Sequence, residues 1–170
     1  QPGEVVLDIG AGTGLSYEPL RQAVGPAGRV LAFEQSPDMF ARAAERVATQ
    51  GFSNVWHVCA SAEAVQLPQA PDALLFNYVH DITRTPEALA NLVRQARPGA
   101  RIAVCGMKFF PWWTGPLNLL AWAKNRPYNA RAAEMWRPWS LLEPLCAEWR
   151  RESIHAGMGY VAWGRLKAPR

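Results

Sequence analysis

Asp8 and three alternate glycines, Gly10, Gly12 and Gly14, are the residues whose types and spacing best fit a chemical site. Glycine lets the backbone turn sharply, and without a Cβ it allows a ligand to lie against the main chain. A helix expected directly after the last glycine would point its free N–H groups at that ligand. The apolar run Val5–Ile9 predicts a strand buried on both faces of a parallel sheet. The stretch therefore predicts a strand, a ligand-binding turn and a helix start.

The spacing of the glycines separates two kinds of nucleotide-binding turn. The dinucleotide fingerprint G-x-G-x-x-G needs a glycine at position 15, where this chain has Leu15. With Asp8, the run D-x-G-x-G-x-G resembles the first motif of class I S-adenosylmethionine-dependent methyltransferases, and in particular their small-molecule type 11/25 members. The resemblance implies that these four residues bind the cofactor. The alternative is a tight turn that binds nothing.

Glu34 and Gln35 close the next predicted strand and its turn. Glu34 stands 20 residues after Gly14, close to where a nucleotide-binding βαβ unit places the carboxylate that accepts both ribose hydroxyls. Two hydroxyl donors match the two oxygens of one carboxylate. The resemblance extends to the second motif of the family and implies that Gln35 lies against the adenine. The alternative is an exposed glutamate at a strand end.

Three further cofactor residues follow from the resemblance: Ser61, Ala62 and Asn77. The segment around Ser61 and Ala62 is similar to the family's D-A-x-x-L-P, whose acid contacts the adenine amino group. Here serine replaces the acid, and two extra residues precede the Leu-Pro pair. Serine accepts a hydrogen bond less strongly than a carboxylate does. Asn77 occupies the position that lies beside the methionine part of the cofactor in the family.

His80 is the candidate general base, and Asp81 is the candidate group that orients it. Both follow a predicted strand at its carboxyl end, where open α/β sheets bind their ligands. An imidazole titrates near neutrality and could take a proton from a hydroxyl acceptor. The alternative is a histidine that only bonds the neighbouring helix. His155, Tyr78 and Lys108 are weaker candidates.

Alternating strand and helix patterns predict an α/β fold that is Rossmann-like and doubly wound. The resemblance implies a seven-stranded sheet, mostly parallel with an antiparallel last strand, in the order 3-2-1-4-5-7-6. Ser36 is expected to cap the second helix, which Gly51 ends. The predicted strands are 5–9, 29–34, 54–59, 71–76, 102–105, 149–154 and 160–166, and the predicted helices lie within 15–24, 36–51, 85–97, 117–124 and 139–146.

The composition changes near Cys105. Residues 1–105 hold 8 Lys and Arg against 10 Asp and Glu, whereas residues 106–170 hold 10 against 4 and seven of the eight tryptophans. We expect a single methyltransferase domain over 1–170, with a cofactor-binding half, 1–105, and a substrate-facing half, 106–170, that ends in a closing hairpin. The resemblance covers residues 4–105.

Aromatic residues after Met107 are expected to form a flat apolar wall over a substrate. Two other readings of this segment stay open. The tryptophans could pack the core, or they could rest at a membrane surface with Lys124, Arg126 and Arg131 facing lipid headgroups.

The apolar fraction of 49% and the charged fraction of 19% are those of a soluble globular protein. The three cysteines show no metal-ligand spacing and are expected to be buried thiols in a reducing compartment. No metal is expected, and the cytoplasm is the expected location because no signal peptide heads the chain. The resemblance also implies that the helices which usually precede the first strand are missing from this sequence.

We therefore expect S-adenosylmethionine-dependent methyl transfer, with S-adenosylhomocysteine as product, to a small, aromatic or apolar acceptor. The acceptor atom, oxygen, nitrogen or carbon, stays open. The chain lacks the N-P-P-Y sequence typical of enzymes that methylate nucleic-acid bases. Two alternatives remain: a degenerate methyltransferase-fold subunit that only binds, and an RNA methyltransferase that uses the basic second half.

Overall fold

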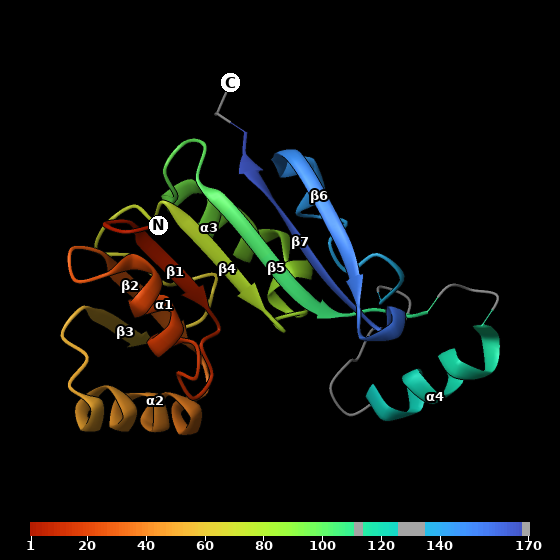
Figure 1. The fold of residues 1–170 in the computed structure, drawn as a ribbon, viewed down its shortest axis with the longest axis horizontal. Coiled ribbons are helices and arrows are strands. Elements are labelled where there is room, and N and C mark those ends of the chain that lie inside the picture. Colours follow the sequence, from red (N-terminus) through yellow and green to blue (C-terminus); the bar gives the residue numbers. More distant parts are fainter. Residues whose placement is uncertain (111–113, 126–134, 168–170) are drawn as a thin grey trace.

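A single mixed sheet organises the chain in the computed structural model, which describes residues 1–110, 114–125 and 135–167 (Figure 1). Its seven strands run in the order β3-β2-β1-β4-β5-β7-β6, which confirms the predicted order. β1 to β5 pair in parallel, and β7 pairs antiparallel with β5 and with β6. The strands are β1 Val5–Ile9, β2 Arg29–Glu34, β3 Val55–Cys59, β4 Ala73–Asn77, β5 Arg101–Met107, β6 Cys146–Ile154 and β7 Gly159–Leu166.

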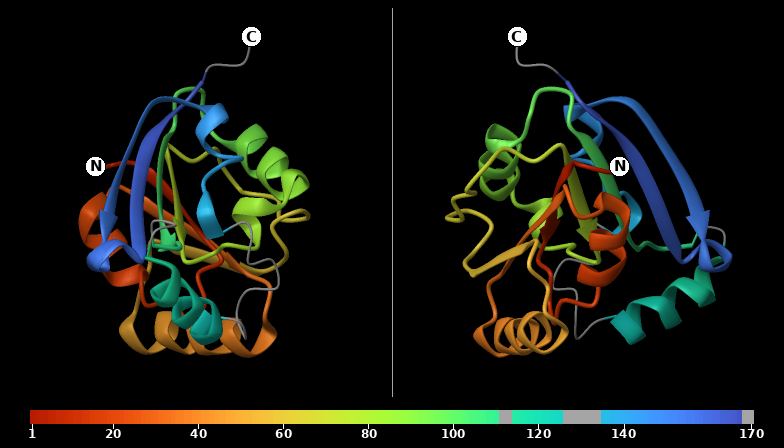
Figure 2. Two further views of the ribbon diagram at one scale, coloured as in Figure 1. Left: turned by 90° about the vertical axis from the view of Figure 1, so that its right-hand side faces the viewer. Right: turned by 60° about the vertical axis from the view of Figure 1, so that its left-hand side comes forward.

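Helices cover both faces of the sheet, and α1 and α3 lie on opposite faces (Figure 2). One apolar cluster packs Tyr17 of α1 and Ala43 of α2 against β1 and β2. A larger cluster packs Leu89 and Leu92 of α3 against the other face. The helices are α1 Tyr17–Val24, α2 Pro37–Gln50, α3 Pro86–Gln95 and α4 Gly115–Asn125, with short 3₁₀ turns η1 Ile82–Arg84, η5 Glu143–Leu145 and η6 His155–Gly157.

Local signals set the bounds of α2 as predicted. The side chain of Ser36 accepts the N–H of Met39, and Gly51 ends the helix with a left-handed φ of 64°. The first helix begins later than expected, at Tyr17, because the turn continues through Leu15, which is 72% exposed. In both cases the helix starts directly after a serine.

The helix predicted over 139–146 was wrong. The chain there makes turns and the short helix η5, and Cys146 already begins β6. Pro144 lies inside η5, and proline lacks the N–H that a longer helix would need. Trp139 and Leu142 keep the apolar spacing of a helix because both are buried in the larger cluster.

The closing hairpin is present, and its first strand is longer than predicted. β6 begins at Cys146 rather than Trp149, with a shift in register between Ala147 and Arg150. Glu148 takes a positive φ of 54° inside this irregular stretch, as expected of a bulge that interrupts a strand's alternating pattern. The bulge hid the early residues of the strand from sequence analysis.

Of the three cysteines, only Cys146 is a buried thiol as predicted; Cys59 is exposed and Cys105 is partly buried. Cys59 ends β3, an edge strand of the sheet, so one side of it has no neighbour. Over the described part of the chain, no helix combines the length and apolar character needed to cross a bilayer.

Candidate active site at the carboxyl edge of the sheet

The turn after β1 forms the floor of the candidate site. Gly10, Gly12 and Gly14 have φ values of 62°, 57° and 73°, a region that residues with a Cβ enter only at a cost. A Cβ on Gly10 would lie 2.7 Å from Cγ1 of Val79, whereas one on Gly12 would meet only Sδ of Met39, at 4.0 Å. Open space thus lies above the middle of the turn, where the sequence predicts that a ligand contacts the backbone.

Asp8 lies beneath the turn and is 1% exposed. Ser16, which directly precedes α1, donates its hydroxyl to Oδ2 of Asp8. Burial raises the pKa of Asp8 to about 6, partly offset by the Ser16 hydrogen bond, and the nearby charge of Glu34 raises it further. The carboxylate therefore ties the end of β1 to the start of α1 and holds the turn from below.

Glu34 faces the turn from the end of β2. Its Oε2 accepts the N–H of Gly12 at 2.8 Å, and its Oε1 accepts the N–H of Ser36 at 2.8 Å. The residue is only 8% exposed. A carboxylate offers about four lone-pair sites, so each oxygen keeps one for a further donor. These two free acceptor positions fit the pair of ribose hydroxyls that the sequence predicts.

A small cavity of about 70 Å³ opens beside Glu34 and is lined by Gln35 and Ala62 as well as Gly10. Ser61, predicted to meet the adenine amino group, is not among its lining residues, whereas Asp81 is. Ligand pockets usually measure at least about 300 Å³. A bound nucleoside would therefore extend beyond this cavity over the glycine turn.

Asn77 ends β4 directly beside the turn, because the register pairs Ile9 with Phe76 one residue earlier. Its Oδ1 accepts a hydrogen bond from the Cys105 thiol, at 2.8 Å. Tyr78 follows with a positive φ of 58°, an uncommon conformation that concentrates at functional sites. This bend turns the chain back so that Val79 reaches Gly10.

His80 does not present a free basic nitrogen. Its Nε2 accepts the backbone N–H of Met107 at 3.1 Å, so the neutral ring carries its proton on Nδ1. Burial lowers the pKa of His80 to about 4, and the charge of Arg84 lowers it further, against a smaller opposite effect of Asp81. Asp81 itself faces the cavity beside Glu34. The geometry therefore argues against the predicted pairing of a base with its orienting carboxylate.

The weaker base candidates are scattered. Tyr78 is 49% exposed, and His155 lies in the hairpin turn between β6 and β7. Lys108 directly follows β5 and lines a second cavity. His57 packs against the ring of Phe40 with centroids 5.0 Å apart.

The second cavity has a volume of about 600 Å³ and lies where β5 ends and the hairpin begins. Its aromatic wall consists of Phe109, Phe110, Trp136, Trp139 and Tyr160. Three cations line it as well: Lys108, Arg137 and Arg151. Sequence analysis anticipated aromatic residues after Met107 but missed Arg151 and Tyr160, which only the pairing of β6 with β7 brings to this place.

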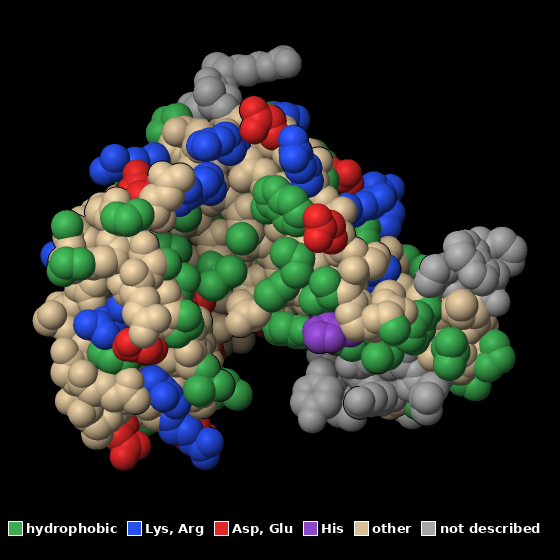
Figure 3. All heavy atoms as spheres, in the orientation of Figure 1, with side chains coloured by type: hydrophobic (Ala, Val, Ile, Leu, Met, Phe, Trp, Pro, Cys, Tyr) green, Lys and Arg blue, Asp and Glu red, His purple; other side chains and the backbone are tan. Residues whose placement is uncertain are grey.

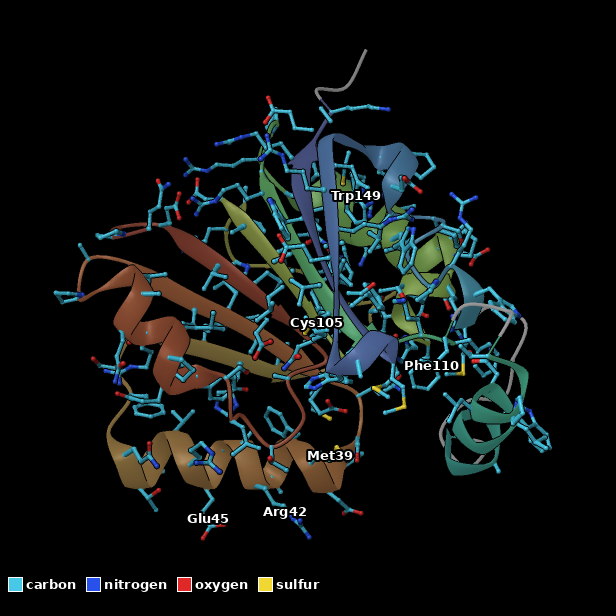
Figure 4. The ribbon with its side chains drawn as sticks, turned by 45° about the vertical axis from the view of Figure 1, so that its right-hand side comes forward. Met39, Arg42, Glu45, Cys105, Phe110 and Trp149 are labelled. Atoms are coloured by element: carbon cyan, nitrogen blue, oxygen red, sulfur yellow. The ribbon has the colours of Figure 1, made fainter. Side chains whose placement is uncertain are left out.

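Both cavities belong to the carboxyl edge of the parallel strands. Figure 3 shows the surface of the molecule notched on this side, beside α2. In Figure 4, Cys105 and Phe110 lie toward this edge and Met39 lies at the near end of α2. Of the other residues named from the sequence, Trp112, Trp113, Arg126 and Arg131 fall outside the described residues, as does the side chain of Lys124.

Comparisons with known proteins identify the family of this chain. The family model for a methyltransferase domain matches residues 6–99, more than half of the chain. The demethylmenaquinone methyltransferase of Thermobifida fusca is 32% identical over 96% of this chain and 72% of its own length. The protein-L-isoaspartate O-methyltransferase of Aeropyrum pernix is 31% identical over 89% of this chain, which spans 57% of that relative.

A solved structure agrees in fold. The SAM-dependent methyltransferase from Aquifex aeolicus superposes with a TM-score of 0.72 at 23% identity, over 98% of this chain and 84% of that one. The strand order, the antiparallel β7 and the glycine turn facing Glu34 are thus accompanied by matches along the sequence and the fold. The chain belongs to the methyltransferase-domain family, with the fold of class I S-adenosylmethionine-dependent methyltransferases.

Proposed function

We propose that this protein transfers a methyl group from S-adenosylmethionine to a small aromatic or apolar acceptor. One observation carries the cofactor half of the proposal. Glu34 holds its two carboxylate oxygens over the glycine turn by accepting the N–H groups of Gly12 and Ser36. Each oxygen keeps a lone pair, and the open space above Gly12 lies beside it.

The residues of the chain have mainly a positioning task in this reaction. When bound, S-adenosylmethionine supplies a methyl group on a sulfonium. The neutral thioether that remains after the transfer, S-adenosylhomocysteine, is a good leaving group. Glu34 would accept hydrogen bonds from the ribose hydroxyls, and Gln35 and Ala62 would flank the adenine. Asn77 would border the methionine part at the end of β4. Alignment of two reactants and exclusion of water account for most of the catalysis in such a transfer.

The acceptor proposal is supported by the aromatic cavity beyond β5. Flat aromatic walls suit a flat apolar molecule, and the cavity of about 600 Å³ is large enough for more than one ring. The two relatives are named for different acceptors, one for demethylmenaquinone and one for protein isoaspartate. The cavity favours a small molecule of the first kind.

Calorimetric titration with S-adenosylhomocysteine tests the proposal. We expect Glu34→Gln to weaken binding about tenfold or more, because a hydrogen bond to a charged group contributes about 1.5 to 3 kcal/mol. Glu45→Gln is the matched control, since Glu45 lies on the outer face of α2 (Figure 4) and is exposed. Equal affinity of Glu34→Gln and wild type would contradict the role of Glu34.

Turnover distinguishes an enzyme from a subunit that only binds. The protein, S-adenosylmethionine and a panel of phenols, quinols and aromatic amines would be assayed for S-adenosylhomocysteine release. Binding of S-adenosylhomocysteine with no turnover on any acceptor would favour the degenerate binding subunit. Binding of RNA that weakens steeply with salt would favour an RNA methyltransferase.

A further inference from the structure

The aromatic cavity beyond β5 carries positive charge that the described residues do not neutralise. Lys108 and Arg151 both line it. The third cation, Arg137, donates to Glu143 at 3.0 Å, whereas no carboxylate within 4.0 Å pairs with Lys108 or Arg151 in the part of the chain that the structure describes. Burial lowers the pKa of Lys108, and the charge of Arg151 lowers it further. Two like charges therefore face one space without an ion-pair partner among the described residues.

Arg151 is held in place by an aromatic ring. Its guanidinium lies 4.8 Å from the centroid of Trp139, a distance within the range of attraction between a cation and a π system. Trp139 in turn meets Tyr160 edge to face, with centroids 4.8 Å apart. The part of the wall that contains Phe109 is fixed by the backbone, because Phe109 donates its N–H to the carbonyl oxygen of Met135 at 3.0 Å. The charged groups thus stand on a preformed frame.

Two buried polar groups beside the cavity have no hydrogen-bond partner among the described residues. They are the hydroxyl of Tyr160 and the indole N–H of Trp139, in residues that are 1% and 5% exposed. A buried donor without a partner costs about 1 to 3 kcal/mol. Both atoms are themselves buried, so the charged ends of Lys108 and Arg151 are the groups that a ligand in the cavity would meet.

Glu152 is the one carboxylate among the described residues that line this cavity. Neighbouring residues of a strand point to opposite faces, and no ion pair joins Glu152 to Arg151 in the described structure. Because Arg137 is paired with Glu143, the balance lies between Lys108 and Arg151 on one side and Glu152 on the other, and it leaves the lining positive. The cavity therefore favours an anion.

We propose that this cavity binds the methyl acceptor as a planar aromatic carboxylate, whose ring packs on Phe110 and Trp136 and whose carboxylate is bound by Lys108 and Arg151. The identification of the ligand as the acceptor rests on the proposed methyltransferase function. The binding chemistry rests only on the cavity itself.

Two ligands that differ in one charge test the proposal: 1-hydroxy-2-naphthoate and its neutral amide, 1-hydroxy-2-naphthamide. Each would be titrated calorimetrically into the full chain, with S-adenosylhomocysteine titrated separately. We expect the naphthoate to bind about tenfold or more tightly than the amide, since charged hydrogen bonds are worth a factor of at least about ten. Lys108→Met and Arg151→Met should weaken the naphthoate to the level of the amide and leave the amide unchanged.

Arg150→Met is the matched control, because Arg150 precedes Arg151 on β6 and is absent from the cavity lining. Arg151→Lys should retain part of the affinity, since it keeps the charge. Equal binding of naphthoate and amide, or equal losses in Arg150→Met and Arg151→Met, would overturn the proposal. Naphthoate binding without any S-adenosylhomocysteine binding would retain the anion site and remove the methyltransferase function. The reverse result would remove only the anion site.

Discussion

In the family that this chain resembles, an acid at the position of Ser61 contacts the adenine amino group, and this chain has serine there. The candidate to replace that acid is Asp81. Its side chain lines the cavity beside Glu34, together with Gln35 and Ala62. Ser61 does not line this cavity, and its backbone carbonyl accepts the N–H groups of Ala64 and Val65 in the turn after β3. An exposed carboxylate at that cavity is a strong acceptor for an amino group. We infer that Asp81, rather than Ser61, accepts the adenine amino group.

An exchange of hydrogen-bond donors tests this role of Asp81. S-inosylhomocysteine carries a 6-oxo group where S-adenosylhomocysteine carries the amino group, so Asp81 would repel it, whereas an asparagine side chain at the same position could donate to it. We expect Asp81→Asn to shift the ratio of the two affinities toward S-inosylhomocysteine about tenfold, as measured by calorimetry. Ser61→Ala should leave the ratio within about twofold of wild type. A shift produced by Ser61→Ala alone would assign the contact to Ser61.

At the scale of elements, the turn after β1 combines strained backbone with close packing. Gly10 has a φ of 62° and would place a Cβ 2.7 Å from Val79. Gly51, which ends α2 in the left-handed region, has a similar φ of 64° but nothing within 4 Å of a Cβ. The two positions therefore share the backbone cost and differ in the space around them.

Alanine at each position separates these two effects. Both Gly10→Ala and Gly51→Ala should lose about 1 to 2 kcal/mol of stability in urea unfolding, because an L side chain disfavours the left-handed region. Only Gly10→Ala should also weaken S-adenosylhomocysteine binding, by about tenfold or more, since the displaced Val79 segment borders the cofactor cavity. If Gly51→Ala impaired binding as strongly, the loss would reflect general destabilisation rather than the geometry of the turn.

The same contrast between local and distant causes explains what the sequence could predict. The Ser36 cap depends on a residue three positions away, and the glycine turn and Glu34 belong to one βαβ unit of regular length, so their spacing predicted them. The helix predicted over 139–146 failed because Trp139 and Leu142 have helical spacing yet are buried by packing against the sheet. The aromatic cavity was only partly foreseen, because Arg151 comes from β6, far along the chain from Lys108.

At the scale of the whole molecule, the titrations of Asp8, which is buried in β1, and of His80, which is partly buried just after β4, affect stability in opposite directions. The pKa of His80 is lowered from 6.5 to about 4, so its contribution to stability is present above pH 6.5 and is lost as the pH falls through about 4. The pKa of Asp8 is raised from 3.8 to about 6, so its contribution is present below pH 3.8 and is lost as the pH rises through about 6. Each contribution amounts to about 3 kcal/mol.

Because the two effects overlap between about pH 4 and pH 6.5, they largely cancel in the wild type. Single variants should reveal each one in urea unfolding at about pH 7 and about pH 4.5. The new amide oxygen in His80→Gln can still accept the N–H of Met107, and the one in Asp8→Asn can still accept from Ser16, so each variant keeps its hydrogen bond but no longer titrates. From about pH 7 to about pH 4.5, the free energy of unfolding of wild type relative to His80→Gln should fall by on the order of 2 kcal/mol. Relative to Asp8→Asn it should rise by a similar amount. Parallel pH profiles for wild type and both variants would mean that neither group titrates abnormally in the folded protein. A change only in the Asp8→Asn comparison would leave His80 free to act as the base that the sequence predicted.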